Sequence, residues 1–344
     1  MNKKWKKMLI PASFIGVSVG LTYFLFHNEP DKEMLKEEKK TVDTPSRLIQ
    51  KEVFLMADDG LPLALTVTQQ IGQAPKAIVQ IIHGILEHKG RYQDFANYLA
   101  ENGYIVVTSD NRGHGESTNS SNPLGHMPSV ERMIADQVAI TYFSKQQYPD
   151  LPVYLYGHSF GSILARNYLQ EHDKDIDKLL LTGTVCYQKL APVGLKLADF
   201  ANRFVGEEQH SWILKKLSGY GETDRSWLTN DLEQIVKVNQ DPKFIAGYDN
   251  IGVTTIWTAD YGLKQIEKYA CQNPDLPILS LSGADDVKIT GGAKGLLDTK
   301  QTLAAIGYRR IDMIEFPNMK HEVLNEIENE LIYQRILAFF EEDE

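Results

Sequence analysis

The sequence predicts an α/β fold in which one mostly parallel sheet of eight strands carries helices on both faces. Two observations predict it. From residue 47 to the C-terminus, short apolar runs bounded by turn residues alternate with longer amphipathic segments. The run Val153–Tyr156 is followed at once by a turn with two glycines and then by a helical pattern. Strands that alternate with helices in this way form parallel sheets whose two faces are covered.

The elements follow one another regularly along the chain. The first two strands form a hairpin around Asp58–Gly60, which has turn chemistry. The eight expected strands are Arg47–Met56, Leu63–Thr68, Ala77–Ile82, Tyr104–Ser109, Val153–Tyr156, Lys178–Thr182, Ile278–Ser282 and Arg310–Glu315. The expected helices are Tyr92–Glu101, Val130–Gln147, Phe160–Glu171, Gly292–Ile306 and Val323–Phe340.

One stretch, residues 187–258, interrupts the alternation between the strands near Leu180 and Leu279. It is too long to be a structureless loop in a compact domain. Its apolar and aromatic residues, from Leu195 to Tyr248, predict a mainly helical cap. These side chains either pack on one another inside the cap or line an apolar groove for an acyl chain.

The first thirty residues differ in composition from the rest. Four lysines surround Trp5, and Met8–Phe26 is a run of nineteen residues without charge. As a helix at ~1.5 Å per residue it spans about 28 Å, close to the hydrocarbon thickness of a bilayer. We expect a transmembrane helix with the N-terminus in the cytoplasm, because the lysines precede it. The alternative is a signal peptide cleaved after Ser18–Gly20 and a secreted protein.

The chain therefore divides into three parts. Residues 1–30 are expected to be a cytoplasmic stub with a transmembrane anchor, which places the remainder at the cell membrane and outside the cytoplasm. Residues 31–46 are rich in charge and poor in apolar side chains, which predicts a solvated linker. Residues 47–344 form the α/β domain, with the cap inserted at about 187–258.

Composition excludes several classes of protein. Hydrophobic residues make up 42% and charged residues 24%, which is typical of a globular chain. The formal net charge is −10, with no long basic run beyond the first residues, so nucleic acid is not expected as a partner. Cys186 and Cys271 cannot form a disulfide framework and lie in no metal-binding pattern, so we expect no metal or other cofactor.

The turn after Val153–Tyr156 carries the first candidate for chemistry. Residues 157–161 read GHSFG, a G-x-S-x-G pattern between a strand and a helix. The glycines permit a cramped turn that exposes a serine hydroxyl above the edge of the sheet. We therefore predict that Ser159 is a nucleophile. A serine that merely caps the helix would need neither glycine.

A serine nucleophile needs a base, and the base needs a partner that orients it. With this turn the chain order is serine, acid, histidine. His321 follows the last expected strand, at the sheet edge where active sites gather. The acid should follow Ile278–Ser282, where two carboxylates, Asp285 and Asp286, compete. Spacing from the preceding glycine favours Asp286, and Asp285 is the alternative.

An oxyanion requires two aimed backbone N–H donors. One is expected from Phe160, directly after the nucleophile. The other is expected from the loop after Ala77–Ile82, where Ile85 is the best candidate. In that loop we expect His83 to hold the backbone by a hydrogen bond rather than to take part in the chemistry.

These motifs together resemble the α/β-hydrolase group that contains monoacylglycerol lipases, bacterial lysophospholipases and serine-aminopeptidase-type hydrolases. The resemblance covers about residues 53–340. The matching segments are HGILEH at 83–88 with RY at 91–92, DNRGHGES at 110–117, GHSFG at 157–161, GADD at 283–286 and HEVLNE at 321–326. In the cap, WLTND at 227–231 and DP at 241–242 resemble the bacterial lysophospholipase-like branch. The sequence lacks the proline common after the acid in this group.

The resemblance implies an α/β-hydrolase fold and a serine hydrolase with a Ser159–His321–Asp286 triad and an acyl-enzyme intermediate. It implies carboxylic esters of single-chain lipids as substrates, with no cofactor. The alternatives are a carboxylesterase or peptidase that acts on small soluble substrates, and a non-catalytic binding protein with the same fold. Acyl length, head group and oligomeric state are not specified by these motifs.

Overall fold

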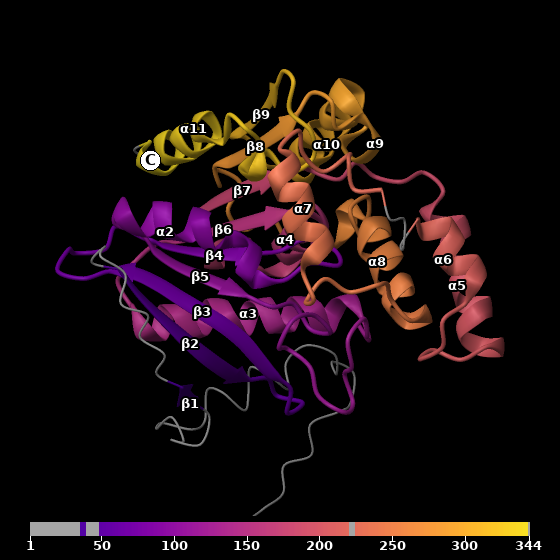
Figure 1. Ribbon diagram of the computed structural model, residues 1–344. Coiled ribbons are helices and arrows are strands. Elements are labelled where there is room, and N and C mark those ends of the chain that lie inside the picture. The colour runs from indigo at the N-terminus through magenta and orange to yellow at the C-terminus, as the bar shows by residue number, and fades with distance from the viewer. Residues whose placement is uncertain (1–34, 39–47, 220–223, 343–344) are drawn as a thin grey trace, which may run out of the picture.

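A single nine-stranded sheet runs through the molecule (Figure 1). The computed structural model describes residues 35–38, 48–219 and 224–342. The strand order is β1-β2-β3-β5-β4-β6-β7-β8-β9. The strands are β1 (Leu35–Glu38), β2 (Leu48–Met56), β3 (Pro62–Gln70), β4 (Ile78–Ile82), β5 (Ile105–Ser109), β6 (Val153–His158), β7 (Lys178–Thr182), β8 (Ile278–Gly283) and β9 (Ile311–Phe316).

The sheet is parallel from β5 to β9 and antiparallel at the other edge, where β1, β2 and β3 pair. Every residue of β4, β5 and β7 is buried. These strands appear as continuous apolar runs in the sequence because both of their faces are covered. Strands β2 to β9 are the eight that the sequence predicts, each with ends within two residues of the expected ones.

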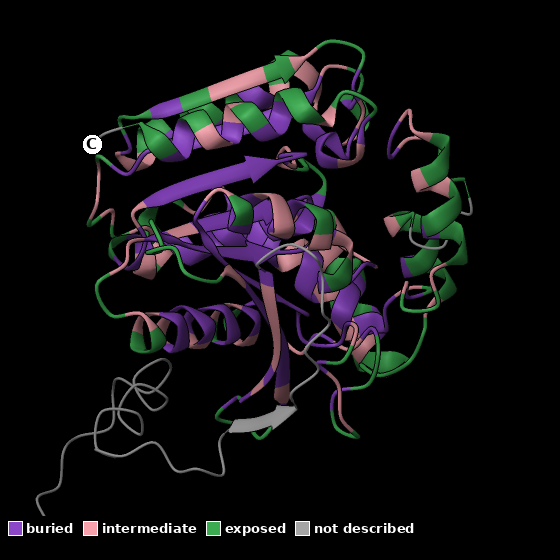
Figure 2. Cartoon of the chain, turned by 60° about the vertical axis from the view of Figure 1, so that its left-hand side comes forward, coloured by how far each residue is buried: buried purple, intermediate pink, exposed green. Residues whose placement is uncertain are grey.

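Helices cover the two faces of the sheet and bury a separate apolar cluster on each. On one face, α2 (Gln93–Glu101) and α11 (Asn329–Glu341) pack around Phe95 and Ile336. On the other, α3 (Val130–Gln147), α4 (Phe160–His172) and α10 (Gly292–Ile306) enclose the larger cluster. Figure 2 shows the buried strands between helices whose outer sides are exposed.

The linker expected at residues 31–46 contains a strand that the sequence did not predict. Strand β1 pairs antiparallel with β2, from Leu35 opposite Leu55 to Glu38 opposite Glu52. Without β1, strand β2 would present an edge of unpaired N–H and C=O groups. Main-chain pairing explains a strand in so charged a segment, because it depends little on side-chain type.

The cap is helical, as predicted. It consists of α5 (Ala191–Phe204), α6 (Trp212–Ser218), α7 (Leu232–Gln240) and α8 (Asn250–Gly262). Figure 1 shows these helices beside the carboxyl ends of the parallel strands. Helix α8 continues past residue 258, where Asn167 of α4 donates a hydrogen bond to the carbonyl of Ala259 (2.9 Å). The cap is thus fixed to the sheet domain through α8.

The single C-terminal helix expected over Val323–Phe340 is wrong at its beginning. A short 3₁₀ turn occupies Val323–Asn325, and α11 begins only at Asn329. Between them, the Glu326 carboxylate accepts hydrogen bonds from the N–H groups of Lys320 (2.7 Å) and Asn230 (3.0 Å). These long-range bonds hold the backbone out of the helix and fix the loop that follows β9.

The predicted transmembrane helix, Met8–Phe26, lies outside the described residues. Within the described ranges, none of the helices is both long and apolar enough to cross a bilayer.

Candidate active site

The turn between β6 and α4 holds Ser159 in a strained conformation. Its φ of +52° and ψ of −118° lie in a region that residues other than glycine rarely occupy. The Ser159 N–H donates to the carbonyl of Thr182 on β7 (3.0 Å). A Cβ atom on Gly157 would collide with the carbonyl of Gly161, so the turn needs a glycine there. The fold therefore places the serine at the carboxyl end of a central strand.

His321 and Asp286 meet beside this turn, although they lie on different loops. The Asp286 Oδ2 atom is 2.7 Å from Nδ1 of His321, and both side chains are 2% exposed. The loops that follow β8 and β9 are joined by bonds from the N–H of Ala284 to Phe316 O (2.8 Å) and from that of Asp285 to Met319 O (3.0 Å). Asp286 is the buried aspartate of the pair, whereas Asp285 is exposed.

The environment of His321 favours its protonated form. Burial alone lowers its pKa, but the charge of Asp286 and the hydrogen bond to it raise the pKa above the usual value. The carboxylates of Glu322 and Glu87 act in the same direction. In the neutral ring, the bond to Asp286 keeps the proton on Nδ1, which leaves Nε2 free to accept one. A neutral ring with an unprotonated Nε2 is the state that a general base requires.

His83 orients the loop that follows β4. The N–H of Asn111 donates to Nε2 of His83 (2.9 Å), so the proton is on Nδ1, which donates to the carbonyl of Gly84 (2.7 Å). Burial lowers the pKa of His83 to about 4, which keeps this tautomer neutral. In a trans peptide the N–H points opposite to the carbonyl, so the Ile85 N–H points away from His83.

Both expected oxyanion donors lie at the same pocket as Ser159. Gly84 approaches the nucleophile turn so closely that a Cβ on it would be 3.1 Å from Cβ of Ser159. Ile85 and Phe160 both line the pocket. Phe160 is the first residue of α4, where a backbone N–H has no acceptor within its own helix. Ile85, Ser159 and Phe160 thus border one pocket.

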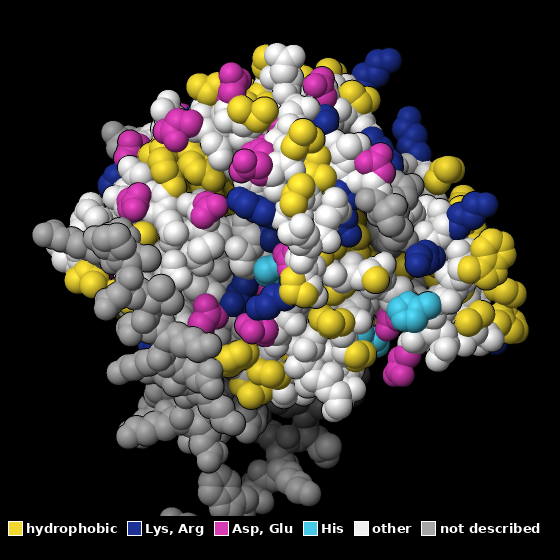
Figure 3. Space-filling model, viewed as in Figure 1, with side chains coloured by type: hydrophobic (Ala, Val, Ile, Leu, Met, Phe, Trp, Pro, Cys, Tyr) yellow, Lys and Arg dark blue, Asp and Glu magenta, His cyan; other side chains and the backbone are white. Residues whose placement is uncertain are grey.

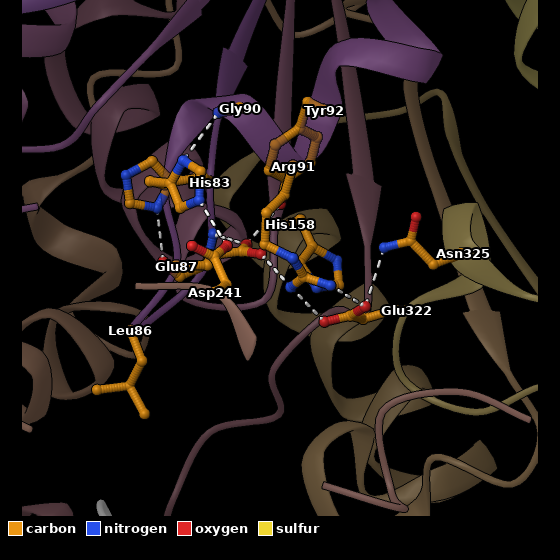
Figure 4. A network of polar contacts seen from close by, with 12 residues as sticks. His83, Leu86, Glu87, Gly90, Arg91, Tyr92, His158, Asp241, Glu322 and Asn325 are labelled. Carbon is orange, nitrogen blue, oxygen red and sulfur yellow. Dashed lines mark hydrogen bonds and ion pairs between the residues drawn. The ribbon is translucent and has the colours of Figure 1, made fainter. Parts of the chain in front are cut away.

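Three charged residues to which the sequence analysis assigned no role form a buried network around this loop (Figure 4). The Glu87 carboxylate accepts from the Gly84 N–H (2.5 Å) and from Arg91 (2.6 Å). Arg91 also makes two bonds of 2.7 Å to Glu322, the residue after His321. Burial raises the pKa of Glu322, but Arg91 lowers it more, to about 2. The network joins the Ile85 loop to the His321 loop.

The network can be recognised only in retrospect from the sequence. Glu87, Arg91 and Glu322 belong to the segments that carry the family resemblance, but no pattern relates residues that are 231 positions apart. The same holds for Arg112, whose fully buried guanidinium binds Asp136 (2.7 Å) and holds the loop of residues 110–117.

A pocket of about 690 Å³ opens above Ser159 and His321. One wall is apolar and consists of α5 and α8, with Val193, Leu197 and Trp257 facing the space. The ring of Trp227, which also lines the pocket, lies 5.0 Å from that of His321, centroid to centroid. Among these residues, Leu197 and Trp227 belong to the range from Leu195 to Tyr248 for which the sequence analysis considered a groove lining. The volume is within the range of sites that bind small molecules.

Three other aromatic residues of the cap lie outside the pocket and are largely exposed to solvent. Phe200, Phe204 and Trp212 are 60%, 69% and 72% exposed. Figure 3 shows apolar side chains gathered over α5 and α6 at the side of the molecule. The rings of Phe200 and Phe204 pack on one another with centroids 4.4 Å apart, as the first alternative expects, whereas Trp212 faces solvent.

The two cysteines, Cys186 and Cys271, are both free thiols. In the part of the chain that the structure describes, no group of three or more His, Cys, Asp or Glu side chains is arranged to hold a metal ion.

The fold and the site define an α/β-hydrolase, and comparison with known proteins identifies the family. Residues 73–328 match the family described as serine aminopeptidase, S33, so the chain belongs to that family. It is 28% identical to a monoglyceride lipase of Rattus norvegicus over 267 residues, which cover 74% of this chain and 81% of that protein. The predictions of this hydrolase group and of a carboxylic ester hydrolase are thus confirmed.

The chain is also similar to a longer protein and to a solved esterase structure. The chain is 30% identical over 271 residues to an uncharacterized abhydrolase domain-containing protein of Dictyostelium discoideum, which covers 78% of this chain but only 26% of that longer protein. Among solved structures, a thermostable carboxyl esterase from Bacillus coagulans in complex with glycerol superimposes with a TM-score of 0.75 and 23% identity, covering 84% of this chain and 97% of that one. At that identity the superposition shows the fold.

Proposed function

We propose that the protein is a membrane-anchored serine hydrolase that cleaves carboxylic esters of single-chain lipids. The observation that carries the proposal is the buried His321–Asp286 pair next to the strained Ser159 turn, at the base of a pocket with an apolar wall. Similarity to monoglyceride lipase supports the substrate class.

In the proposed mechanism Ser159 attacks the ester carbonyl while Nε2 of His321 accepts the hydroxyl proton. Asp286 orients the ring and stabilises the imidazolium. The N–H groups of Phe160 and Ile85 stabilise the tetrahedral oxyanion. His321 then gives the proton to the leaving alcohol, which leaves an acyl-serine. Water, activated by His321, attacks that ester and releases the fatty acid.

A lipid substrate is favoured because the pocket has room for a chain and because part of its lining is aliphatic and aromatic. Each buried CH₂ group contributes about 0.8 kcal/mol. Four additional methylenes therefore add roughly 3 kcal/mol, provided that the transition state keeps those contacts. Two-chain lipids are expected to be poorer substrates, since a second chain must also pass the cap.

The anchor proposal depends on the uncharged run of residues 8–26 and the lysines before it. It implies a single-pass protein of the cell membrane with a cytoplasmic N-terminus and the catalytic domain outside the cytoplasm. The alternative, a secreted enzyme after signal cleavage, gives the same catalytic domain without the anchor.

Two measurements test the catalytic proposal. A fluorophosphonate probe should label the wild-type protein but not Ser159→Ala. It should also label the control Ser121→Ala, because Ser121 is exposed and distant from Ser159 in the sequence. With p-nitrophenyl esters, kcat/KM should rise from C4 to at least C8. A profile that peaks at C2 to C4 indicates a small-ester carboxylesterase instead, and a protein that the probe leaves unlabelled indicates a non-catalytic binding protein.

A further inference from the structure

The charged residues that line the pocket separate into two sets. Glu87 and Glu322 both pair with Arg91 within the buried network. The second set includes Arg225 and lies in the cap and at the mouth of the pocket. The remaining charged residues that line the pocket are Lys216, Arg225, Asp260 and Lys288.

Arg225 is a half-buried cation without a carboxylate partner among the described residues. Its guanidinium lies 3.6 Å from the centre of the Phe244 ring, and this stacking is the contact that holds it. Burial lowers its pKa, and the positive charge of Arg91 lowers it further, while Glu322 and Asp241 offset part of this effect. A guanidinium in that environment gains from an anion.

Arg225 also lies close to the reacting groups. Trp227, two residues further along, packs against the His321 ring. Lys320, next to His321, donates a hydrogen bond to the carbonyl of Ser226 (2.7 Å). The arginine thus lines the same pocket as Ser159 and His321, on a segment that contacts the His321 loop.

The acidic residue of the second set, Asp260, lies on a different element from Arg225. Asp260 is on α8, where its carboxylate accepts a hydrogen bond from the N–H of Gln188 (3.0 Å). Burial raises its pKa to about 7, so at neutral pH it carries only part of a charge. It does not compete for the guanidinium of Arg225, since no ion pair joins them among the described residues.

We propose that Arg225 binds the phosphate of an anionic head group, so that lysophospholipids with a phosphate on glycerol are preferred to neutral monoacylglycerols. This proposal rests on the proposed function, since it specifies the head group at the same site. The acyl chain lies along α5 and α8 while the ester reaches Ser159, and the leaving glycerol phosphate lies toward Arg225. Planar guanidinium groups bind phosphate through two parallel hydrogen bonds.

The test uses the full-length protein in detergent and two substrates with the same acyl chain, 1-decanoylglycerol and 1-decanoylglycerol 3-phosphate. We expect the wild-type protein to hydrolyse the phosphate substrate with the higher kcat/KM. Arg225→Gln should lower that value about tenfold and leave that of decanoylglycerol within about twofold, because one charged hydrogen-bonded contact is lost. Arg225→Lys should retain an intermediate preference, since it keeps the charge but not the fork.

Arg310→Gln is the matched control. This exposed arginine directly precedes β9, at the amino ends of the parallel strands, whereas the pocket lies at their carboxyl ends. The variant should change neither kcat/KM value. Free glycerol 3-phosphate should inhibit hydrolysis of a neutral ester by the wild type more strongly than glycerol does. This arm separates recognition of free phosphate from recognition of the lipid, and it needs no variant. Equal losses for both substrates in Arg225→Gln, or equal inhibition by both alcohols, overturn the head-group proposal. Loss of hydrolysis of every ester by the wild type overturns the proposed function instead.

Discussion

Replacing Glu322 by glutamine removes one carboxylate from the buried network without changing its shape. The side chains of Glu322 and Arg91 are only 5% and 9% exposed, so solvent screens their ion pair little. The folded-state pKa of about 2 lies below the ordinary value of 4.5. That difference corresponds to about 3 kcal/mol of stability at neutral pH. A stability loss of this size is expected when one partner of a buried ion pair is removed. The loss lies at the low end of that range because Arg91 still pairs with Glu87.

The sign of the pH dependence follows from the direction of the shift. A carboxyl whose pKa is lowered by folding contributes fully above its unfolded value and loses that contribution as the pH falls toward the folded value. The difference in unfolding free energy between wild type and Glu322→Gln should therefore be about 3 kcal/mol at pH 7. It should narrow by about 1 kcal/mol at pH 3.5. In a thermal scan at pH 7, Tm should fall by roughly 4 to 5 °C.

Urea denaturation at the two pH values measures this difference, and Glu328→Gln is the control because Glu328 is exposed. The control should lie within about 0.5 kcal/mol of the wild type at both pH values. A loss below 1 kcal/mol at pH 7, or a difference that does not narrow in acid, would refute the assignment of a stabilising buried ion pair.

Three further predictions follow from the site and the N-terminus. Each of three substitutions should lower kcat by a factor of at least ~10³ with the fold intact, namely Ser159→Ala, His321→Ala and Asp286→Asn. Asp285→Asn should keep its activity. The reverse result for the two aspartates would make Asp285 the acid. The acid limb of kcat/KM should have its midpoint above the ordinary histidine value of 6.5, since Asp286 raises the pKa of His321, and a midpoint below 6.5 contradicts this. Full-length protein should sediment with membranes and resist carbonate, and removal of residues 1–30 should release active soluble enzyme; mature protein that starts near residue 21 would indicate signal cleavage instead.

Much of the fold is predictable because it depends on local patterns. Helix α3 begins and ends where its apolar periodicity does, at Val130–Gln147, and Ser129 caps it by accepting a hydrogen bond from the N–H of Arg132 (3.2 Å). The exceptions are β1 and the break before α11. Strand β1 exists through main-chain pairing with β2, and the break is held by the Glu326 carboxylate through its bond to the distant Asn230, so neither is visible in a short window of sequence.

The candidate site divides in the same way. The strand–turn–helix around Ser159 can be read locally, since the two glycines and the flanking periodicities lie within a few residues. For the acid, the spacing from the preceding glycine favoured Asp286 but left Asp285 as the alternative, because only the tertiary structure decides which of two adjacent loop residues is turned toward His321. The proposed head-group residue, Arg225, is noticed only once the cap is packed against the domain.

The sequence by itself determined the α/β class, the order of strands β2 to β9 along the chain, the helical character of the cap and the nucleophile turn, since periodicity and turn chemistry in successive short segments encode them. Only the tertiary structure decided the pairing of Asp286 with His321 and the Glu87–Arg91–Glu322 network. It also decided which cap residues face the pocket and which face solvent. These depend on contacts between segments distant in the chain, whose geometry is set by how the sheet brings its loops to one edge.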